Sequence, residues 1–318
     1  MELTVQEFLQ IDLPALAAAV LACVANAIVG NFLILRRQSL LGDAVSHAVL
    51  PGIVGGFLLL GTRATWAMFA GALAAAIFAG VAIEAVRRWG RMEAGAAMGV
   101  VFTIMFAGGV LMIEQSAAHA VDLDADCVLY GALEDIIWMA PTGWSSLLLA
   151  ATWADLPREV ATLAGMVLVI GVVVVAFWKE LKLTTFDPAL ASALGIPAGL
   201  FHYGLVALTA GAAVASFEAV GSILVIAMLI CPAATARMLT DRLSNQVWLS
   251  VLFGVVAAVV GYLAAAFGPR LFGVEQSLSA AGMIAVVAGL LLTLAVVLGP
   301  RHGVLGRRLR TRSLAQPA

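Results

Sequence analysis

Long apolar stretches recur along almost the whole chain, and each is about as long as a helix that crosses a lipid bilayer. A transmembrane helix needs about 20 consecutive apolar residues. Nine such stretches occur, at residues 13–35, 44–60, 64–83, 94–113, 160–178, 198–217, 219–236, 247–267 and 278–298. Because only 11% of the 318 residues are charged, a water-soluble surface cannot be built. The sequence therefore predicts an all-α, polytopic membrane bundle with lipid as its solvent.

The number of spans is open between eight and nine. The stretch at 44–60 is short, and 198–217 and 219–236 follow each other without an obvious loop. Eight spans and a half-helix are therefore an alternative to nine spans. We see no linker or shift in composition between the stretches, so we expect one transmembrane domain over 1–318 with a basic cytoplasmic tail at 301–318.

The basic residues predict an orientation, because Lys and Arg prefer the cytoplasmic side of a membrane. With nine spans and an outer N-terminus, fourteen of the seventeen Lys and Arg residues fall on the cytoplasmic side. The three exceptions are Arg63, Arg158 and Arg270. The long loop at 115–158 then faces outward.

The charge balance and the cysteines exclude several other classes of protein. The net charge is −2, which does not favour a nucleic-acid partner. Cys23, Cys127 and Cys231 lie far apart, without the spacing of a disulfide framework or a structural zinc motif. We therefore expect no permanently bound cofactor.

Ionisable residues within the apolar stretches are the main candidates for function, because burying a charge in a membrane is costly. Asp43 and His47 are four residues apart, so on a helix they share one face and can bind one divalent transition metal. A helix cap with a buried structural histidine is an equally good interpretation of this pair.

Glu218 interrupts the junction of two stretches and is a candidate third ligand or a gate. Helical rise places His47 about 15 Å from the inner surface, counted from Arg37, but Glu218 about 28 Å, counted from Arg237. The two residues share a depth only if a helix is broken. Membrane transporters do use broken helices at their sites.

A short helix is predicted on the cytoplasmic side. Asp187 is a good N-cap, Pro188 suits the first turn, and Gly195 after Leu194 suits the left-handed position that ends a helix. Such a helix at 187–195 is suited to dock into a groove of a partner, although an ordinary connector is the alternative.

Two further features concern helix packing. Pro232 is expected to loosen or kink the stretch that contains it. Gly52 with Gly56 and Gly95 with Gly99 form small-xxx-small pairs, which in a chain with 31 glycines carry little weight.

Three motifs, in this order, resemble the membrane permeases of bacterial ABC importers for zinc, manganese or iron. They are the run from Leu35 to Gly52, the helix from Phe186 to Gly195 and the segment from Val220 to Leu243. The segments from Asp126 to Gly131 and from Gly299 to Gly303 are similar to the same branch of that family.

The resemblance implies roles for residues and a set of partners. Asp43 and His47 match the positions that hold the transported Mn, Zn or Fe ion, and the helix at 187–195 matches the coupling helix that docks on the ATPase. Such permeases work as pairs, identical or paralogous, in the bacterial inner membrane, with ABC ATPase subunits inside and a metal-binding solute-binding protein outside. The sequence contains no GxxxxGK[ST] loop, so ATP hydrolysis is expected in the separate subunit.

Two other classes of function fit the sequence less well. An intramembrane hydrolase would need a signature such as HExxH, GxGD or GxSxG, and none occurs. A secondary, ion-coupled metal carrier could use the same Asp43 and His47 without an ATPase. Copurification of an ATPase would distinguish this carrier from an ABC importer.

Overall fold

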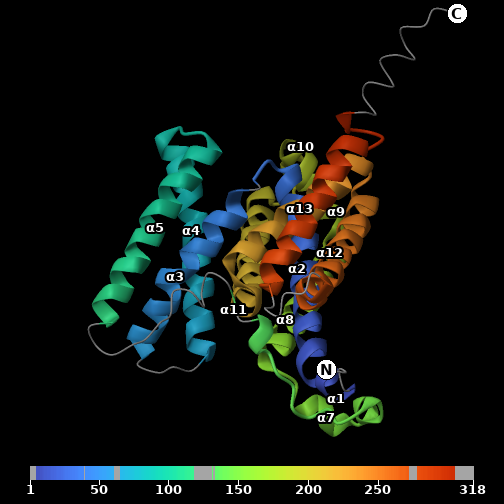
Figure 1. Cartoon of the computed structure of the whole chain (residues 1–318). Coiled ribbons are helices and arrows are strands. Elements are labelled where there is room, and N and C mark those ends of the chain that lie inside the picture. Colours follow the sequence, from blue (N-terminus) through green and yellow to red (C-terminus); the bar gives the residue numbers. More distant parts are fainter. Residues whose placement is uncertain are drawn as a thin grey trace, which may run out of the picture.

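The computed structural model describes residues 5–38, 40–60, 65–117, 131, 133–271 and 278–304, and no strand occurs among these residues. Figure 1 shows the helices packed as a bundle, with α3, α4 and α5 in a lobe on one side. The elements are α1 (Val5–Glu7), η1 (Phe8–Asp12), α2 (Leu13–Leu35), α3 (Leu40–Leu60), α4 (Thr65–Gly90), α5 (Ala94–Ala117), η2 (Leu133–Asp135), η3 (Trp144–Leu148), α7 (Ala150–Ala154), α8 (Arg158–Ala176), α9 (Trp178–Phe186), α10 (Pro188–Ala193), α11 (Ala198–Leu239), α12 (Leu243–Leu271) and α13 (Ala280–Leu298).

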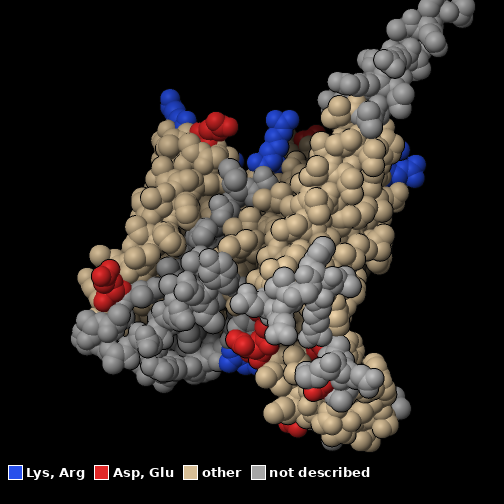
Figure 2. Space-filling model, in the orientation of Figure 1, with Lys and Arg blue, Asp and Glu red and all other residues tan. Residues whose placement is uncertain are grey.

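Most of each predicted stretch lies in a helix, although 160–178 runs past the end of α8 and 278–298 begins two residues before α13. Within the described part of the chain, eight helical segments are long and apolar enough to cross a membrane. The remaining predicted stretch, 44–60, corresponds to α3, and several side chains of this helix lie outside the described residues. On the face in Figure 2, the described charged residues gather toward the two ends of the bundle, and the band between them is uncharged.

α11 consists of two antiparallel helices joined at Gly221. This residue has φ 74° and ψ 168°, a non-helical conformation open essentially to glycine. Before the break, the helix runs from the C-terminal end of α2, where Arg36 contacts His202, to the middle of α2, where Asn26 donates a hydrogen bond to Ser216.

After the break the chain runs back to the end where α11 began. Leu229 packs against Gly30 of α2, and Met238 packs against Gly299 at the end of α13. The two stretches that lacked an obvious loop are therefore separate, antiparallel segments, because a single glycine makes the turn. The helix continues through Pro232, and the residue with non-helical backbone angles inside α11 is Gly221. The loosening or kink expected at Pro232 stays a prediction.

α2 lies at the centre of the bundle, and its buried side chains are mostly small. Small residues allow helices to approach closely where lipid provides no hydrophobic drive for association. Two buried amides add specific bonds: Asn26 donates to Ser216 of α11 at 2.8 Å, and Asn31 donates to Ser250 of α12 at 2.6 Å. These contacts fix the level of α2 relative to both neighbours.

α4 extends beyond its predicted stretch, which ended at residue 83. It continues to Gly90 because Glu84 pairs with Arg87 and Arg88, three and four residues further along the same helix. The charged residues therefore form a helical extension at the end of the bundle that is predicted to face the cytoplasm.

Candidate functional site

The three predicted metal ligands lie in two neighbouring helices. Asp43 and His47 are in α3, one helical turn apart, and Glu218 is in α11, just before the break at Gly221. The backbones of all three positions are described, whereas their side chains lie outside the described residues. Their role as metal ligands therefore stays a prediction, and the structure bears on their positions.

The depth of α3 is fixed by Leu229. The backbone of Leu229 lies against Gly30 of α2, and its side chain lies against Gly42 of α3, so these three residues share one level. His47 follows Gly42 by five residues, which places it about 7.5 Å further toward the outer end.

Glu218 reaches nearly the same level through α2. Asn26 precedes Gly30 by four residues, about 6 Å toward the outer end, and bonds to Ser216. Glu218 lies two residues, about 3 Å, beyond Ser216. Glu218 is thus about 9 Å from Gly30 toward the outer end, and His47 is about 7.5 Å from the same level. The two residues lie within one helical turn of each other in depth.

This result corrects the difference in depth calculated from the sequence. That calculation added the rise of all residues from Glu218 to Arg237. The chain reverses at Gly221, so the rise of the residues before the turn must be subtracted. The structure provides the broken helix that a shared depth requires.

The predicted cytoplasmic helix is α10, and its ends have the expected chemistry. The Asp187 carboxylate accepts a hydrogen bond from the backbone N–H of Leu190 at 2.9 Å, and Pro188 occupies the first turn. Gly195 has φ 80°, the left-handed conformation that ends the helix after Leu194. Leu190 and Leu194 are exposed, so α10 presents apolar side chains at the end of the bundle that is predicted to be cytoplasmic.

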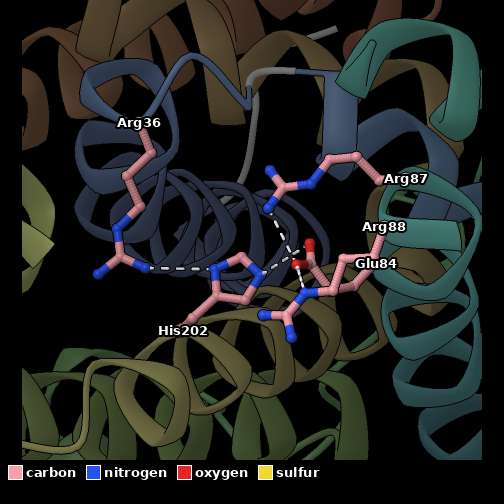
Figure 3. Close-up of polar contacts among 5 residues, drawn as sticks. All are labelled: Arg36, Glu84, Arg87, Arg88 and His202. Atoms are coloured by element: carbon pink, nitrogen blue, oxygen red, sulfur yellow. Dashed lines mark hydrogen bonds and ion pairs between the residues drawn. The ribbon is translucent and has the colours of Figure 1, made fainter. Parts of the chain in front are cut away.

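A polar cluster connects the end of α9, directly before α10, to the rest of the bundle. Figure 3 shows Arg36, Glu84, Arg87, Arg88 and His202 of this cluster and its surroundings. The Arg36 guanidinium donates to the hydroxyls of Thr184 at 3.1 Å and Thr185 at 3.2 Å, in the last turn of α9. It also contacts Nδ1 of His202 at 3.5 Å, near the start of α11. Burial lowers the pKa of Arg36 to about 10, so it stays charged at neutral pH.

Glu84 lies on the other side of His202. Its carboxylate is 4.0 Å from Nε2 of His202 and accepts hydrogen bonds from Arg87 at 2.9 Å and Arg88 at 2.6 Å. Beside these residues is a cavity of about 430 Å³, which Arg36, Glu84 and His202 help to line. We call Arg36, Glu84, Thr184, Thr185 and His202 the Arg36 cluster.

Sequence reasoning did not identify the Arg36 cluster as a site. Glu84 did carry a signal, because it precedes Arg87 and Arg88 by one helical turn at the end of an apolar stretch. Nothing in the sequence brings His202 to Glu84, since these residues are more than a hundred positions apart.

A second contact joins the segment from Val220 to Leu243 to the segment from Gly299 to Gly303. The Asp241 carboxylate accepts hydrogen bonds from Arg301 at 2.6 Å and His302 at 2.8 Å. These contacts hold the turn between α11 and α12 against the segment that follows α13. In the part of the chain that the structure describes, no three His, Cys, Asp or Glu side chains form a group that could hold a metal ion.

Comparisons with known proteins agree with this arrangement of helices. The model of the "ABC 3 transport family" matches residues 7–299. The chain is 36% identical over 300 residues to the manganese transport system membrane protein MntD of Bacillus subtilis, which covers 94% of this chain and 96% of that protein. It is 38% identical over 296 residues to the zinc transport system membrane protein TroD of Treponema pallidum, and the match covers 93% of this chain and 76% of that protein.

A solved structure is also similar over nearly the full length. The structure of PsaBC from Streptococcus pneumoniae in complex with Fab matches with a TM-score of 0.72 and 27% identity, and the match covers 94% of each chain. The sequence match and the shared arrangement of helices lead to the same conclusion. The chain belongs to the ABC 3 transport family.

Proposed function

We propose that this ABC permease imports divalent manganese or zinc ions past a site that includes Asp43, His47 and Glu218. The observation that carries the proposal is that Glu218, just before the break at Gly221, lies within one helical turn of the depth of His47, while Asp43 lies one turn from His47 in the neighbouring α3. Broken helices are typical of transporter sites because they bring backbone and side-chain donors together within the membrane. The relatives named for manganese and zinc support the same class of substrate. Iron remains a prediction of the resemblance alone.

The proposed donors suit a transported ion. A carboxylate and an imidazole one turn apart can bind one divalent transition metal, and Glu218 supplies a third oxygen ligand or closes the path. Oxygen and nitrogen donors hold such ions less tightly than thiolates do. A site of this kind can therefore release its ion during each cycle.

The transport cycle is proposed to be alternating access. A metal-binding protein docks at the outer end and delivers the ion to the site between two permeases, identical or paralogous, in the bacterial inner membrane. ATP binding and hydrolysis in a separate ABC ATPase move α10, and the path opens toward the cytoplasm. The exposed Leu190 and Leu194 supply apolar contacts for a groove in that ATPase.

The test replaces the charged and coordinating groups without changing the size of the side chains greatly. Asp43→Asn and His47→Leu should each abolish uptake in proteoliposomes that contain the assembled permease and ATPase. If the residues are a cap and a structural histidine, the loss should instead appear as poor assembly. Asp155→Asn, an exposed carboxylate outside the spans, is the matched control and should transport normally.

Two results would contradict the proposal. One is transport near the wild-type rate by an assembled Asp43→Asn, His47→Leu double variant. The other is metal uptake by the permease without any ATPase. For Glu218, a ligand predicts that Glu218→Gln weakens metal binding, whereas a gate predicts an altered transport rate at unchanged affinity.

A further inference from the structure

The Arg36 cluster lies at the point where the cytoplasmic helix, α2 and α11 meet. Arg36 is the C-cap of α2, and only a short link separates it from α3. The two threonines that bind it lie in the last turn of α9, directly before Asp187, the N-cap of α10. The guanidinium is thus a direct side-chain connection between the segment that carries α10 and the link that leads to Asp43.

The link after Arg36 is held to α2 by its own hydrogen bonds. The backbone N–H of Arg37 donates to Ile34 at 3.0 Å, and that of Gln38 donates to Leu33 at 2.9 Å. Gln38 in turn accepts a hydrogen bond from the backbone N–H of Leu41, in the first turn of α3. A displacement of Arg36 therefore moves the start of α3 instead of being absorbed by a slack loop.

The donor and acceptor roles within the cluster follow from the chemistry of arginine. A guanidinium only donates, so Nδ1 of His202 must be the acceptor and Nε2 carries the proton. Nε2 faces the buried carboxylate of Glu84, which is fixed to the end of α4 by Arg87 and Arg88. One chain of polar contacts thus joins α9, α2, α11 and α4.

We infer that the Arg36 cluster transmits the movement of α10 to α3, and that Arg36 is the positioning residue that links ATP hydrolysis to the metal path. This inference rests on the proposed function of α10. The planar guanidinium is suited to this role because it holds three partners at once in a fixed geometry. The cavity of about 430 Å³ beside it leaves room for the side chains to rearrange.

The test separates transmission from assembly and from metal binding. Arg36→Gln is reconstituted with the ATPase, and complex yield, metal binding, ATP hydrolysis and the number of ions transported per ATP are measured. We expect the complex to form and to bind and hydrolyse ATP, while ions transported per ATP fall at least about tenfold, the effect of losing one charge-assisted hydrogen bond. Arg37→Gln, the exposed neighbouring arginine, is the matched control and should keep the wild-type ratio.

Two further variants distinguish a loss of coupling from a loss of folding. Thr185→Val removes one acceptor and keeps the side-chain shape, so it should lower the ratio less than Arg36→Gln does. Arg36→Lys keeps the charge but cannot hold all three partners, so it should restore the ratio only in part. An unchanged ratio in Arg36→Gln would overturn the inference, as would failed assembly of both Arg36 variants with a normal ratio in Thr185→Val. Failure of the wild-type complex to couple uptake to ATP would instead contradict the proposed function.

Discussion

Replacement of Gly30 by alanine adds a single carbon atom at a point where two helices already touch. Gly30 is buried in α2 against the backbone of α11. A Cβ built on Gly30 overlaps the carbonyl oxygen of Leu229 and lies 2.9 Å from its carbonyl carbon and 3.3 Å from its Cα. These are backbone atoms, so no side chain can rotate away and the two helices must separate.

The expected magnitude follows from two opposing effects. Adding a carbon to a packed core costs about 1–3 kcal/mol, and a clash with rigid backbone belongs at the upper end. Alanine also favours the helical state over glycine by about 1 kcal/mol. Gly30→Ala should therefore lower the free energy of unfolding by about 2 kcal/mol.

Gly254→Ala is the matched control. Gly254 lies in α12 and also faces α2, but a Cβ there is 3.5 Å from the Cβ of Cys23, an ordinary contact. The control should therefore be as stable as the wild type or up to about 1 kcal/mol more stable, so the two variants should differ by about 2–3 kcal/mol.

Thermal unfolding of the purified permease in detergent measures this difference, and metal uptake measures its consequence. Because the Leu229 side chain lies against Gly42, a shift of α11 also displaces α3, so Gly30→Ala should reduce uptake as well. Equal melting temperatures for Gly30→Ala and Gly254→Ala would refute this account of the close approach.

Three further predictions concern the ends of the bundle. Gly195→Val forces a left-handed residue with φ 80° to carry a branched side chain, at a local cost of about 1–2 kcal/mol, and should reduce the ATPase copurified with the permease while metal binding persists. Hydrogen bonds, chiefly from His302 and then from Arg301, lower the pKa of Asp241 to about 2. The stabilisation from these bonds is therefore present above about pH 4 and is lost as the pH falls to 2. The difference in melting temperature between the wild type and Asp241→Asn should vanish over that range; a constant difference would contradict the assignment. Asp155→Cys and Ser192→Cys, each in a chain without the three native cysteines, should react with membrane-impermeant thiol reagents from opposite sides of the membrane. Labelling of both from the same side would exclude the nine-segment arrangement.

The elements that the sequence predicted well depend on local chemistry. A span is recognised by its own apolar residues, so the sequence predicted the eight helical segments that are long and apolar enough to cross a membrane in the described part of the chain. The ends of α10 were also predictable, because Asp187, Pro188 and Gly195 act on backbone groups within a few residues of themselves. Periodicity alone placed Asp43 and His47 on one face of a helix.

Packing glycines show where such local reasoning fails. The pair Gly52 and Gly56 carried little weight in the sequence, yet both approach Gly71 of α4 closely. Gly99, in an equivalent pattern in α5, has open space where its Cβ would lie. The pattern is the same in both helices, and only the neighbouring helix decides whether it is used.

The sequence by itself determined the membrane class, the helical segments, the capped cytoplasmic helix and the residues proposed to bind metal. Only the tertiary structure decided that the chain reverses at Gly221, and hence that Glu218 and His47 lie at one level. It also decided that Arg36 meets His202 and two threonines of α9. Hydropathy and capping act between neighbours in the chain, whereas depth and partner choice depend on how distant helices pack, which no local pattern encodes.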